Sequence, residues 1–460
     1  MNAAFSMSLK QAANAMGAHY QGDDVLLKGV STDTRSIQSG ELFVALIGPN
    51  FDGHQYINTA IDKGAVACMV STSQNSGNEL LVEDTRLGLG RLANVWRSQL
   101  NLPVIAVTGS NGKTTVKEML ASIFKQNVKT DDHVLATKGK LNNDIGLPLT
   151  LLQLNKQHEY AVIEMGANHP GEIKYLAELA QPDIAVVTNA GAAHLEGFGS
   201  LEGVARAKGE AFTTLNDGST AIINADDAYY SLWLEMIKKT SKSINVVSFG
   251  LNQNADVSAN WQATGQGCKL EVRTAQAEFD IELKLLGQHN VQNALAAVAA
   301  AIAAGVSIDN IRAGLSAMHA VPGRLELKTG INGSRIIDDT YNANPTSLSA
   351  AIHVLKDFPG AHYLALGDMG ELGTDAKKIH QQVGIDAKNE GVKQLYSVGV
   401  MAAEAAQTFG ENAFVFDAHP PAINKIQNDL NSNVTLLVKG SRLSHMEYVV
   451  DALTIGAGGD

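Results

Sequence analysis

The chain has 460 residues, of which 45% are hydrophobic, and a formal net charge of −12. This length predicts roughly three domains of about 150 residues each, and the apolar fraction is ordinary for a soluble globular protein. The acidic balance argues against a nucleic-acid partner, and the only two cysteines, Cys68 and Cys268, exclude a disulfide framework or a cysteine-based zinc site.

No membrane insertion and no secretory signal are expected from the sequence. Residues 1–10 have no basic segment followed by an apolar core. The most apolar stretch, residues 294–306, is alanine-rich and too short for a bilayer about 30 Å thick, so a packed internal helix is expected there. We therefore expect a cytoplasmic protein.

The first block, residues 1–101, mixes short strands with helices. Residues 41–46 and 65–70 are predicted strands, and residues 87–99 are a predicted helix that leads into the next block. Pro103 disfavours helix just before it, which marks the junction between the first two domains.

A glycine-rich turn follows the predicted buried strand at residues 104–107 and precedes a predicted helix. Backbone N–H groups of such a turn and the positive end of the helix bind phosphate oxygens. Lys113 would reach the outer phosphates, and the Thr114 hydroxyl would bind Mg²⁺. The loop is a shortened form of the common pattern, because Val107 stands where its first glycine would be, and the alternative is a glycine turn that merely begins a helix. The predicted ATP-binding residues of the loop are Gly109, Ser110, Asn111, Gly112, Lys113, Thr114 and Thr115.

The second block, residues 102–320, carries this loop and further buried strands. Strands are predicted at residues 160–164, 183–188 and 220–224, separated by helical stretches. Such alternation indicates a parallel sheet with helices on both faces. Polar–apolar alternation within residues 256–286 predicts antiparallel hairpins added to that core.

The third block, residues 321–460, predicts a doubly wound, Rossmann-like α/β unit. It begins at Val321-Pro322-Gly323-Arg324 and contains a predicted helix at residues 347–358. Strands are predicted near residues 335–338, 363–366, 394–398, 414–416 and 434–438, with helices between them. The chain is thus predicted to be an α/β protein of three domains.

Several polar residues follow predicted strands, at the sheet edge where α/β proteins bind ligands. Glu164 suits a second metal ligand, with a solvated edge carboxylate as the alternative. Three roles are open for His194: a metal ligand, a hydrogen-bond partner of the transferring phosphate, or a structural histidine. Lys208 by itself is typical of a solvated helical lysine. Residues 338–345 suit either a ribose contact or an Asx-rich turn before a helix.

Taken together and in order, these motifs resemble the Mur ligase superfamily of ATP-dependent amide-bond ligases over nearly the whole chain. The resemblance is carried by Ser31-Thr32-Asp33-Thr34-Arg35, Asp52-Gly53-His54, the phosphate loop, Leu141-Asn142-Asn143, Glu164-Met165-Gly166-Ala167, His194-Leu195-Glu196-Gly197, Ala207-Lys208-Gly209-Glu210, Gly287-Gln288-His289-Asn290, Pro322-Gly323-Arg324, Tyr341-Asn342-Ala343-Asn344-Pro345 and Val438-Lys439-Gly440-Ser441-Arg442. The Leu-Asn-Asn and Tyr-Asn-Ala-Asn-Pro segments point to the members that add D-alanyl-D-alanine to UDP-N-acetylmuramoyl-tripeptide.

The resemblance implies a ligase that makes UDP-N-acetylmuramoyl-pentapeptide, ADP and phosphate for peptidoglycan synthesis, and so for cell-wall biogenesis, cell shape, cell division and the cell cycle. The tripeptide carboxylate would attack ATP to form an acyl phosphate, which the dipeptide amine would then attack. The first domain would bind the UDP-muramoyl substrate, the second ATP, and the third would close on ATP and bind the dipeptide. A monomer is expected.

The resemblance also implies catalytic roles. Lys208 would react with carbon dioxide to form a carbamate and, with Glu164 and His194, would hold a second Mg²⁺. Thr114 would hold the first Mg²⁺ beside the ATP phosphates, and Lys113 would clamp those phosphates. These residues form the predicted catalytic and metal-binding set.

Further residues match the binding positions of the superfamily. Asn290 and Asn293 would contact the adenine, and Arg324 and Asp339 the phosphate and ribose side of ATP. The predicted substrate-binding residues are Ser31, Thr32, Arg35, Asp52 and His54 for the UDP-sugar, Asn142 and Asn143 for the peptide arm, and Tyr341, Asn342, Asn344, Lys439 and Arg442 in the third domain. Lys140 departs from the usual asparagine. Its added cation would either alter contacts to the acidic peptide arm or point to solvent, and we favour the second alternative.

Three other functions are alternatives to the D-alanyl-D-alanine-adding ligase. Within the superfamily they are the ligase that adds the third peptide residue and folylpolyglutamate synthetase. The first-domain UDP-type motifs argue against the folate enzyme, and the Tyr-Asn-Ala-Asn-Pro run argues against the third-residue ligase. A nucleotide-dependent switch protein is the alternative from another class, and it would need neither Lys208 nor a third α/β domain.

Overall fold

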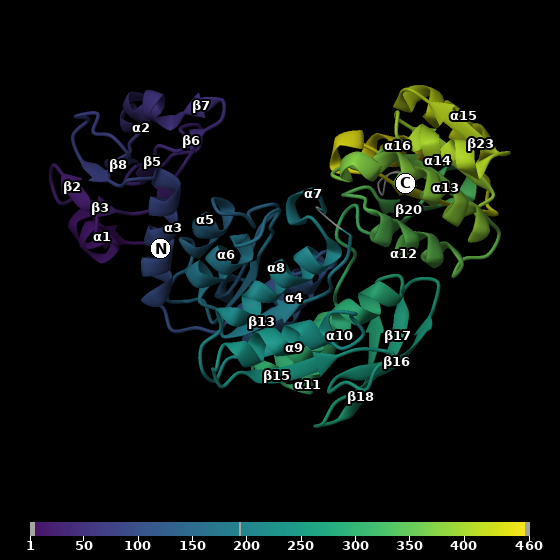
Figure 1. The fold of residues 1–460 in the computed structure, drawn as a ribbon, viewed down its shortest axis with the longest axis horizontal. Coiled ribbons are helices and arrows are strands. Elements are labelled where there is room, and N and C mark those ends of the chain that lie inside the picture. Colours follow the sequence, from purple (N-terminus) through teal and green to yellow (C-terminus); the bar gives the residue numbers. More distant parts are fainter. Residues whose placement is uncertain (1–4, 193–194, 456–460) are drawn as a thin grey trace.

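The computed structural model describes residues 5–192 and 195–455, and its fold is α/β. Three sheet-centred units follow one another along the chain, each with its own hydrogen-bonded sheet. The first and third units rise from opposite ends of the central unit (Figure 1). The predicted α/β class is confirmed, whereas the domain limits at residues 101 and 320 stay predictions.

The first unit is built on a five-stranded sheet of order β2-β9-β8-β5-β4, in which only β2 is antiparallel to its neighbour. The predicted strands at residues 41–46 and 65–70 are confirmed in shorter form as β5 and β8. Its strands are β1 (Met7–Ser8), β2 (His19–Gln21), β3 (Leu26–Leu27), β4 (Val30–Ser31), β5 (Leu42–Val44), β6 (Ile47–Gly48), β7 (Phe51–Asp52), β8 (Ala67–Val70) and β9 (Glu79–Leu81), and its helices are α1 (Leu9–Met16), α2 (Ile57–Asp62) and α3 (Thr85–Ser98).

The central unit has a six-stranded parallel sheet of order β11-β12-β10-β13-β14-β15. Its middle strands are buried along their whole length, as expected for parallel strands covered on both faces. The sheet strands are β10 (Val104–Thr108), β11 (Val134–Ala136), β12 (Tyr160–Glu164), β13 (Ile184–Val187), β14 (Thr220–Asn224) and β15 (Asn245–Phe249). The helices are α4 (Lys113–Val128), α5 (Gly146–Leu151), α6 (Glu172–Ala180), α7 (Leu195–Phe198), α8 (Leu201–Thr213), α9 (Tyr230–Lys239), α10 (Gln288–Ala303) and α11 (Ile308–Ser316).

A three-stranded antiparallel sheet is added to the central unit, as the alternation in residues 256–286 predicts. It consists of β16 (Ser258–Ala263), β17 (Cys268–Arg273) and β18 (Glu278–Leu283). Every second residue of β17 is buried and the others are exposed, which is the pattern of a sheet with one solvated face. The expected internal helix is α10, whose alanine-rich stretch is buried.

The third unit has a six-stranded sheet of order β19-β20-β24-β21-β22-β23. Its five predicted parallel strands are confirmed, but the edge strand β19, which runs antiparallel to β20, was not expected. The strands are β19 (Glu326–Thr329), β20 (Arg335–Asp339), β21 (Ala361–Gly367), β22 (Gln394–Val398), β23 (Ala413–Phe416) and β24 (Val434–Lys439), and the helices are α12 (Pro345–Leu355), α13 (Ala376–Asn389), α14 (Ala402–Phe409), α15 (His419–Asp429) and α16 (Glu447–Leu453). Short 3₁₀ helices lie at Gly53–Tyr56, Asp131–His133, Ile331–Gly333, Gly373–Asp375 and Arg442–Ser444.

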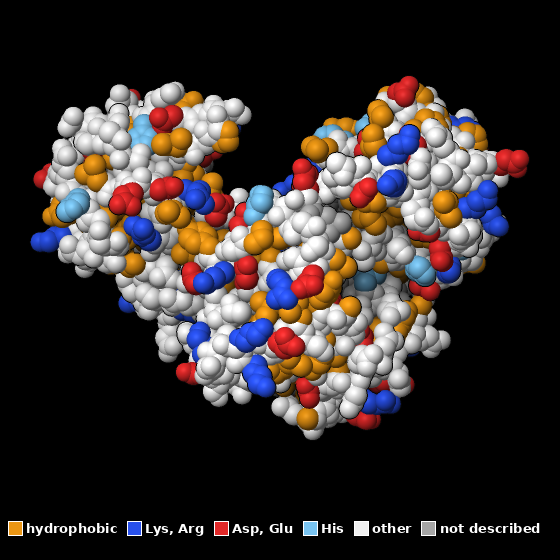
Figure 2. Space-filling model, viewed as in Figure 1, with side chains coloured by type: hydrophobic (Ala, Val, Ile, Leu, Met, Phe, Trp, Pro, Cys, Tyr) orange, Lys and Arg blue, Asp and Glu red, His pale blue; other side chains and the backbone are white. Residues whose placement is uncertain are grey.

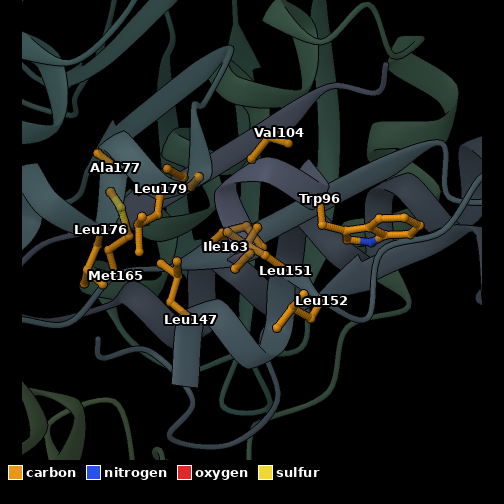
Figure 3. Packing of buried hydrophobic residues seen from close by; sticks show 14 of the residues in the cluster. Trp96, Val104, Leu147, Leu151, Leu152, Ile163, Met165, Leu176, Ala177 and Leu179 are labelled. Carbon is orange, nitrogen blue, oxygen red and sulfur yellow. The ribbon is translucent and has the colours of Figure 1, made fainter. Parts of the chain in front are cut away.

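Helix α3 joins the hydrophobic core of the first unit to that of the central unit. Figure 3 shows Trp96 of α3 beside residues of the central unit such as Leu151 and Leu152. The Trp96 indole N–H also donates to the Leu154 carbonyl at 2.9 Å. This continuous core fixes α3 against the central unit. Separately, no helix in residues 5–192 and 195–455 has the length and apolarity needed to cross a membrane.

Candidate active site

The phosphate loop lies between β10 and α4, where the sequence places it. Gly109 and Gly112 have φ values of 145° and 82°, which disfavour residues with a Cβ atom. A Cβ at Gly109 would also lie 1.9 Å from the Thr188 hydroxyl, and one at Gly112 would lie 2.3 Å from the Asn293 side-chain oxygen. The loop therefore requires glycine at both positions, and its N–H groups lie at the positive end of α4.

Lys113 and Thr114, the first residues of α4, face polar partners around the loop. The Lys113 Nζ donates to the carbonyl oxygens of Gly109 at 2.7 Å and Ser110 at 3.2 Å. Burial lowers the pKa of Lys113, while the nearby Glu164 carboxylate raises it. The Thr114 hydroxyl donates to Glu164 Oε2 at 3.0 Å. A positively charged group, Lys113, and a negatively charged group, Glu164, thus lie on either side of Thr114.

Glu164 is held at the carboxyl end of β12 by contacts on both sides. Its side chain is 2% exposed, so the alternative of a solvated edge carboxylate is wrong. Its backbone N–H donates to the Thr137 hydroxyl at 3.0 Å, and its Oε1 accepts from Asn142 Nδ2 at 2.8 Å. The carboxylate is therefore oriented towards the phosphate loop before any ligand binds.

Lys208 lies on α8 and is only 1% exposed, so the prediction of a solvated lysine from its local sequence is wrong. Its Nζ lies 3.4 Å from the Ala167 carbonyl oxygen and 5.1 Å from the centre of the Phe198 ring. Burial, reinforced by Lys113, lowers its pKa to about 7. Much of Lys208 is therefore a neutral amine near neutral pH. His194 lies outside the described residues, and among the others no group of three carboxylate, histidine or cysteine side chains is placed to hold a metal ion.

A first cavity of about 570 Å³ opens beside the phosphate loop and is lined by the predicted nucleotide residues. Asn293 Nδ2 donates to Asn290 Oδ1 at 3.1 Å. Across the cavity, Arg324 Nη2 donates to the Thr114 hydroxyl at 3.1 Å. Lys439 forms an ion pair with Asp339 at 2.5 Å. The structure therefore brings residues of the central and third units together around one space.

A further hydrogen bond ties the third unit to the phosphate loop, and a cation–π contact within the third unit orders its side of the cavity. Asn344 Nδ2 donates to Asn111 Oδ1 at 2.8 Å, and Asn344 also caps α12 by accepting from the Ser347 N–H at 2.8 Å. The Arg324 guanidinium lies 4.1 Å from the centre of the Tyr341 ring, within the range of a cation–π contact. The Asn-rich turn before α12 therefore both starts the helix and contacts the loop.

A second cavity of about 690 Å³ shares Lys113 with the first one as a lining residue. Both cavities are also lined by Asn142, Tyr341, Asn342 and Asn344. The predicted residues Asn143 and Arg442 line the second cavity alone. Lys140 is exposed but also lines this second cavity, with its Nζ 5.7 Å from the Tyr341 ring centre, so both alternatives for its role stay predictions.

The predicted UDP-sugar residues lie in the first unit, away from both cavities. Arg35 is 87% exposed at its side chain and pairs with Asp33 at 2.6 Å. The His54 ring is fully used, because its Nδ1 bonds to Asp52 Oδ1 at 2.6 Å and its Nε2 accepts from the Ser71 N–H at 3.1 Å. Ser31 and Thr32 lie on or just after β4.

Sequence reasoning missed several residues that line the nucleotide cavity. Asp226 and Asp227 follow β14, and their position at the carboxyl end of a predicted strand was the available signal. His289 lies within a motif that carried the family resemblance but was given no role. Burial lowers the pKa of His289 to about 4, which keeps the ring neutral near neutral pH.

Family models match three successive parts of the chain. The Mur ligase family catalytic domain matches residues 26–123, the Mur ligase middle domain matches residues 107–301, and the Mur ligase glutamate ligase domain matches residues 323–442. Together these matches span parts of all three units.

Known proteins resemble the chain over nearly its full length. UDP-N-acetylmuramoyl-tripeptide–D-alanyl-D-alanine ligase of Escherichia coli strain K12 is 43% identical over 97% of this chain and 98% of that protein. A crystal structure of MurF from Acinetobacter baumannii superposes with a TM-score of 0.91 at 36% identity, covering 98% of this chain and 99% of that one. MurF of Thermotoga maritima, in complex with ADP, gives a TM-score of 0.82 at 28% identity, covering 92% and 96% of the two chains.

Proposed function

The chain belongs to the Mur ligase family, and from this premise we propose that it joins D-alanyl-D-alanine to UDP-N-acetylmuramoyl-tripeptide at the expense of ATP. The product is UDP-N-acetylmuramoyl-pentapeptide, a precursor of peptidoglycan. The observation that carries this proposal is that Lys113 lines two cavities. One cavity lies beside the phosphate loop, and the other is lined by residues of all three units.

The position of Lys113 between the two cavities suits the transfer of a phosphoryl group from a nucleotide to a peptide. A tripeptide carboxylate oxygen attacks the γ-phosphorus of ATP, the bond to the bridging oxygen breaks, and ADP leaves with that electron pair. The acyl phosphate then meets the dipeptide amine, which attacks the acyl carbon, loses a proton and expels phosphate. Lys113 supplies positive charge beside this one phosphoryl group, first on ATP and then in the acyl phosphate, and positioning provides most of the catalysis.

Arg324 supports the placement of ATP phosphates in the first cavity. Its Nε is buried and finds no hydrogen-bond partner within residues 5–192 and 195–455. A buried guanidinium N–H without an acceptor is unfavourable, and a phosphate oxygen would satisfy it. Asn290 and Asn293 would then lie on the adenine side of the cavity.

The residues around Glu164 fit Mg²⁺, which prefers oxygen ligands. The Glu164 carboxylate and the Thr114 hydroxyl lie 3.0 Å apart and face the phosphate loop. Thr114 would hold one ion and Glu164 a second, with His194 and a carbamate on Lys208. The ions would neutralise phosphate charge. The buried Lys208 amine suits carbamate formation, because only the neutral amine attacks carbon dioxide and its pKa is lowered to about 7.

The first unit would hold the UDP-sugar and deliver the peptide arm to the second cavity. Ser31, Thr32, Arg35 and the Asp52–His54 loop would form that pocket, with His54 shaping the loop through its two ring contacts. Figure 2 shows a hollow between the first and third units, which closure would narrow. We further propose a cytoplasmic monomer, in keeping with the nucleotide-linked substrate.

Phosphate release tests this function. The complete mixture contains ATP, Mg²⁺, UDP-N-acetylmuramoyl-tripeptide and D-alanyl-D-alanine, and each component is omitted in turn. We expect release only from the complete mixture, together with a pentapeptide identified by mass. Release that persists without the dipeptide and the muramoyl substrate would instead indicate a nucleotide switch or another nucleotide hydrolase.

A further inference from the structure

The second cavity contains an ion pair that no step of the proposed reaction uses. Arg86 lies in the first turn of α3, and its Nη1 donates to Asp144 Oδ2 at 2.5 Å. Both residues line the cavity, and their side chains are 43% and 35% exposed. The pair therefore offers one positive and one negative group to an occupant of this corner.

The backbone around Arg86 is held firmly. Asp84 caps α3 by accepting from the N–H groups of Arg86 at 2.8 Å and Leu87 at 3.0 Å. One turn later, a Cβ at Gly90 would lie 2.3 Å from the Tyr175 hydroxyl, so α3 lies directly against α6. The hydrogen bond to Asp144 raises the pKa of Arg86, which keeps the guanidinium charged.

The pair lies close to the place where the tripeptide carboxylate would react. Asp144 follows Asn142 by two residues, and Asn142 Nδ2 donates to Glu164 Oε1 at 2.8 Å. Two residues span at most about 7 Å, so Asp144 lies on the same short segment as Asn142, which contacts the proposed metal ligand Glu164. The substrate group nearest to a reacting carboxylate is the side chain on the same carbon atom, which belongs to the third peptide residue.

We propose that Arg86 and Asp144 determine specificity for the third peptide residue by binding a side chain that ends in both a carboxylate and an ammonium group, as diaminopimelate does. This inference rests on the proposed ligase function. The substrate carboxylate pairs with the Arg86 guanidinium and the substrate ammonium pairs with the Asp144 carboxylate, so two ion pairs replace one. A lysine side chain ends in an ammonium alone, and it would occupy Asp144 while leaving Arg86 without its carboxylate.

The test compares two tripeptide substrates, one with diaminopimelate and one with lysine at the third position. For the unmodified protein we expect a higher kcat/KM with diaminopimelate. Arg86→Met should lower kcat/KM for that substrate about 10- to 100-fold, mainly through KM, because a charged hydrogen-bond partner is lost. The same variant should change kcat/KM for the lysine substrate little and leave KM for D-alanyl-D-alanine unchanged, so the preference disappears.

Three controls make this comparison decisive. Arg86→Lys keeps the charge and should retain part of the preference. Arg273→Met removes an arginine that pairs with Glu278 at 3.4 Å on the β17–β18 hairpin, and should alter neither substrate. If Arg86→Met turns over too slowly, the affinity for each tripeptide is measured by calorimetry without ATP. The unmodified protein, Arg86→Met and a second variant, Asp144→Asn, are then compared in the same way.

Two results would overturn the inference while the proposed function stands. One is equal kcat/KM for both tripeptides in the unmodified protein. The other is an equal loss on both substrates in Arg86→Met, which would make the ion pair a structural tie between α3 and the Asp144 loop. If neither tripeptide yields pentapeptide, the proposed function itself fails, and this inference fails with it.

Discussion

At the scale of single residues, Lys208 has surroundings that differ from those that its local sequence indicates. A lysine on an amphipathic helix normally extends to solvent, yet this one is 1% exposed, with its Nζ 3.4 Å from the Ala167 carbonyl oxygen and 5.1 Å from the Phe198 ring centre. Such burial disfavours the ammonium form. The predicted modification of Lys208 came from the family resemblance, whereas its burial and lowered pKa come from the fold.

Lys208→Met is expected to remove a pH dependence of stability. Burial lowers the pKa of Lys208 from 10.5 to about 7 in the folded protein. Between these two pH values the unfolded chain holds a proton that the folded protein does not, so the free energy of unfolding rises with pH. Urea denaturation in buffer free of carbon dioxide, at both ends of this range, should show a larger rise for the unmodified protein. Parallel pH curves for the two proteins would contradict the lowered pKa.

Lys208→Ala is expected to abolish turnover while ATP still binds. Lys208 is not among the proposed nucleotide-binding residues, whereas it belongs to the proposed second Mg²⁺ site. Steady-state phosphate release and calorimetric ATP titration measure the two properties separately. Partial rescue of turnover by short carboxylates would support the carbamate. A variant that turns over normally would exclude any role for Lys208 in the reaction.

At the scale of elements, strands buried on both faces could be predicted from their apolar runs. β12 and β14 begin and end where the sequence indicates, and so does β22. The edge strand β19 was missed because its residues alternate between partly buried and exposed and are only four in number. Glu164 was predicted from its place at the end of a strand and Asn142 from the family resemblance, but only the folded protein shows that the Asn142 side chain reaches Glu164.

Gly90→Ala is expected to destabilise the junction between α3 and α6. The new Cβ would lie 2.3 Å from the Tyr175 hydroxyl, so the Tyr175 side chain or one of the two helices must shift, at a cost of about 1–3 kcal/mol. Urea denaturation measures the loss. The double variant Gly90→Ala/Tyr175→Phe serves as the matched control, because it removes the atom that clashes and should recover most of the stability. A Gly90→Ala protein as stable as the parent would show that the close contact is absent in solution.

At the scale of the whole molecule, the two cavities belong to an arrangement of three units rather than to any one of them. The first and third units stand apart above the central unit (Figure 1), and the predicted UDP-sugar residues line neither cavity. No sequence pattern indicates how far apart the units stand, because each motif is informative only about its own strand and loop. The contacts of Asn344 with Asn111 and of Arg324 with Thr114 show where the third unit already meets the loop.

Closure of the units on substrates is expected to make the molecule more compact. With a non-hydrolysable ATP analogue and UDP-N-acetylmuramoyl-tripeptide together, the radius of gyration from small-angle X-ray scattering should fall below that of the unliganded protein. The physical reason is that one substrate must contact the first unit and the second cavity at once. An unchanged radius in a protein that turns over under the same conditions would mean that the reaction proceeds without closure.

The transfer of oxygen from the tripeptide to phosphate tests the central claim most directly. UDP-N-acetylmuramoyl-tripeptide is labelled with a heavy oxygen isotope in its reacting carboxylate and incubated with ATP, Mg²⁺ and D-alanyl-D-alanine. If an acyl phosphate forms beside Lys113, which lines both cavities, mass spectrometry will find one heavy oxygen in each released phosphate. Unlabelled phosphate accompanying pentapeptide formation would contradict this account, because the carboxylate oxygen would then never have bonded to phosphorus.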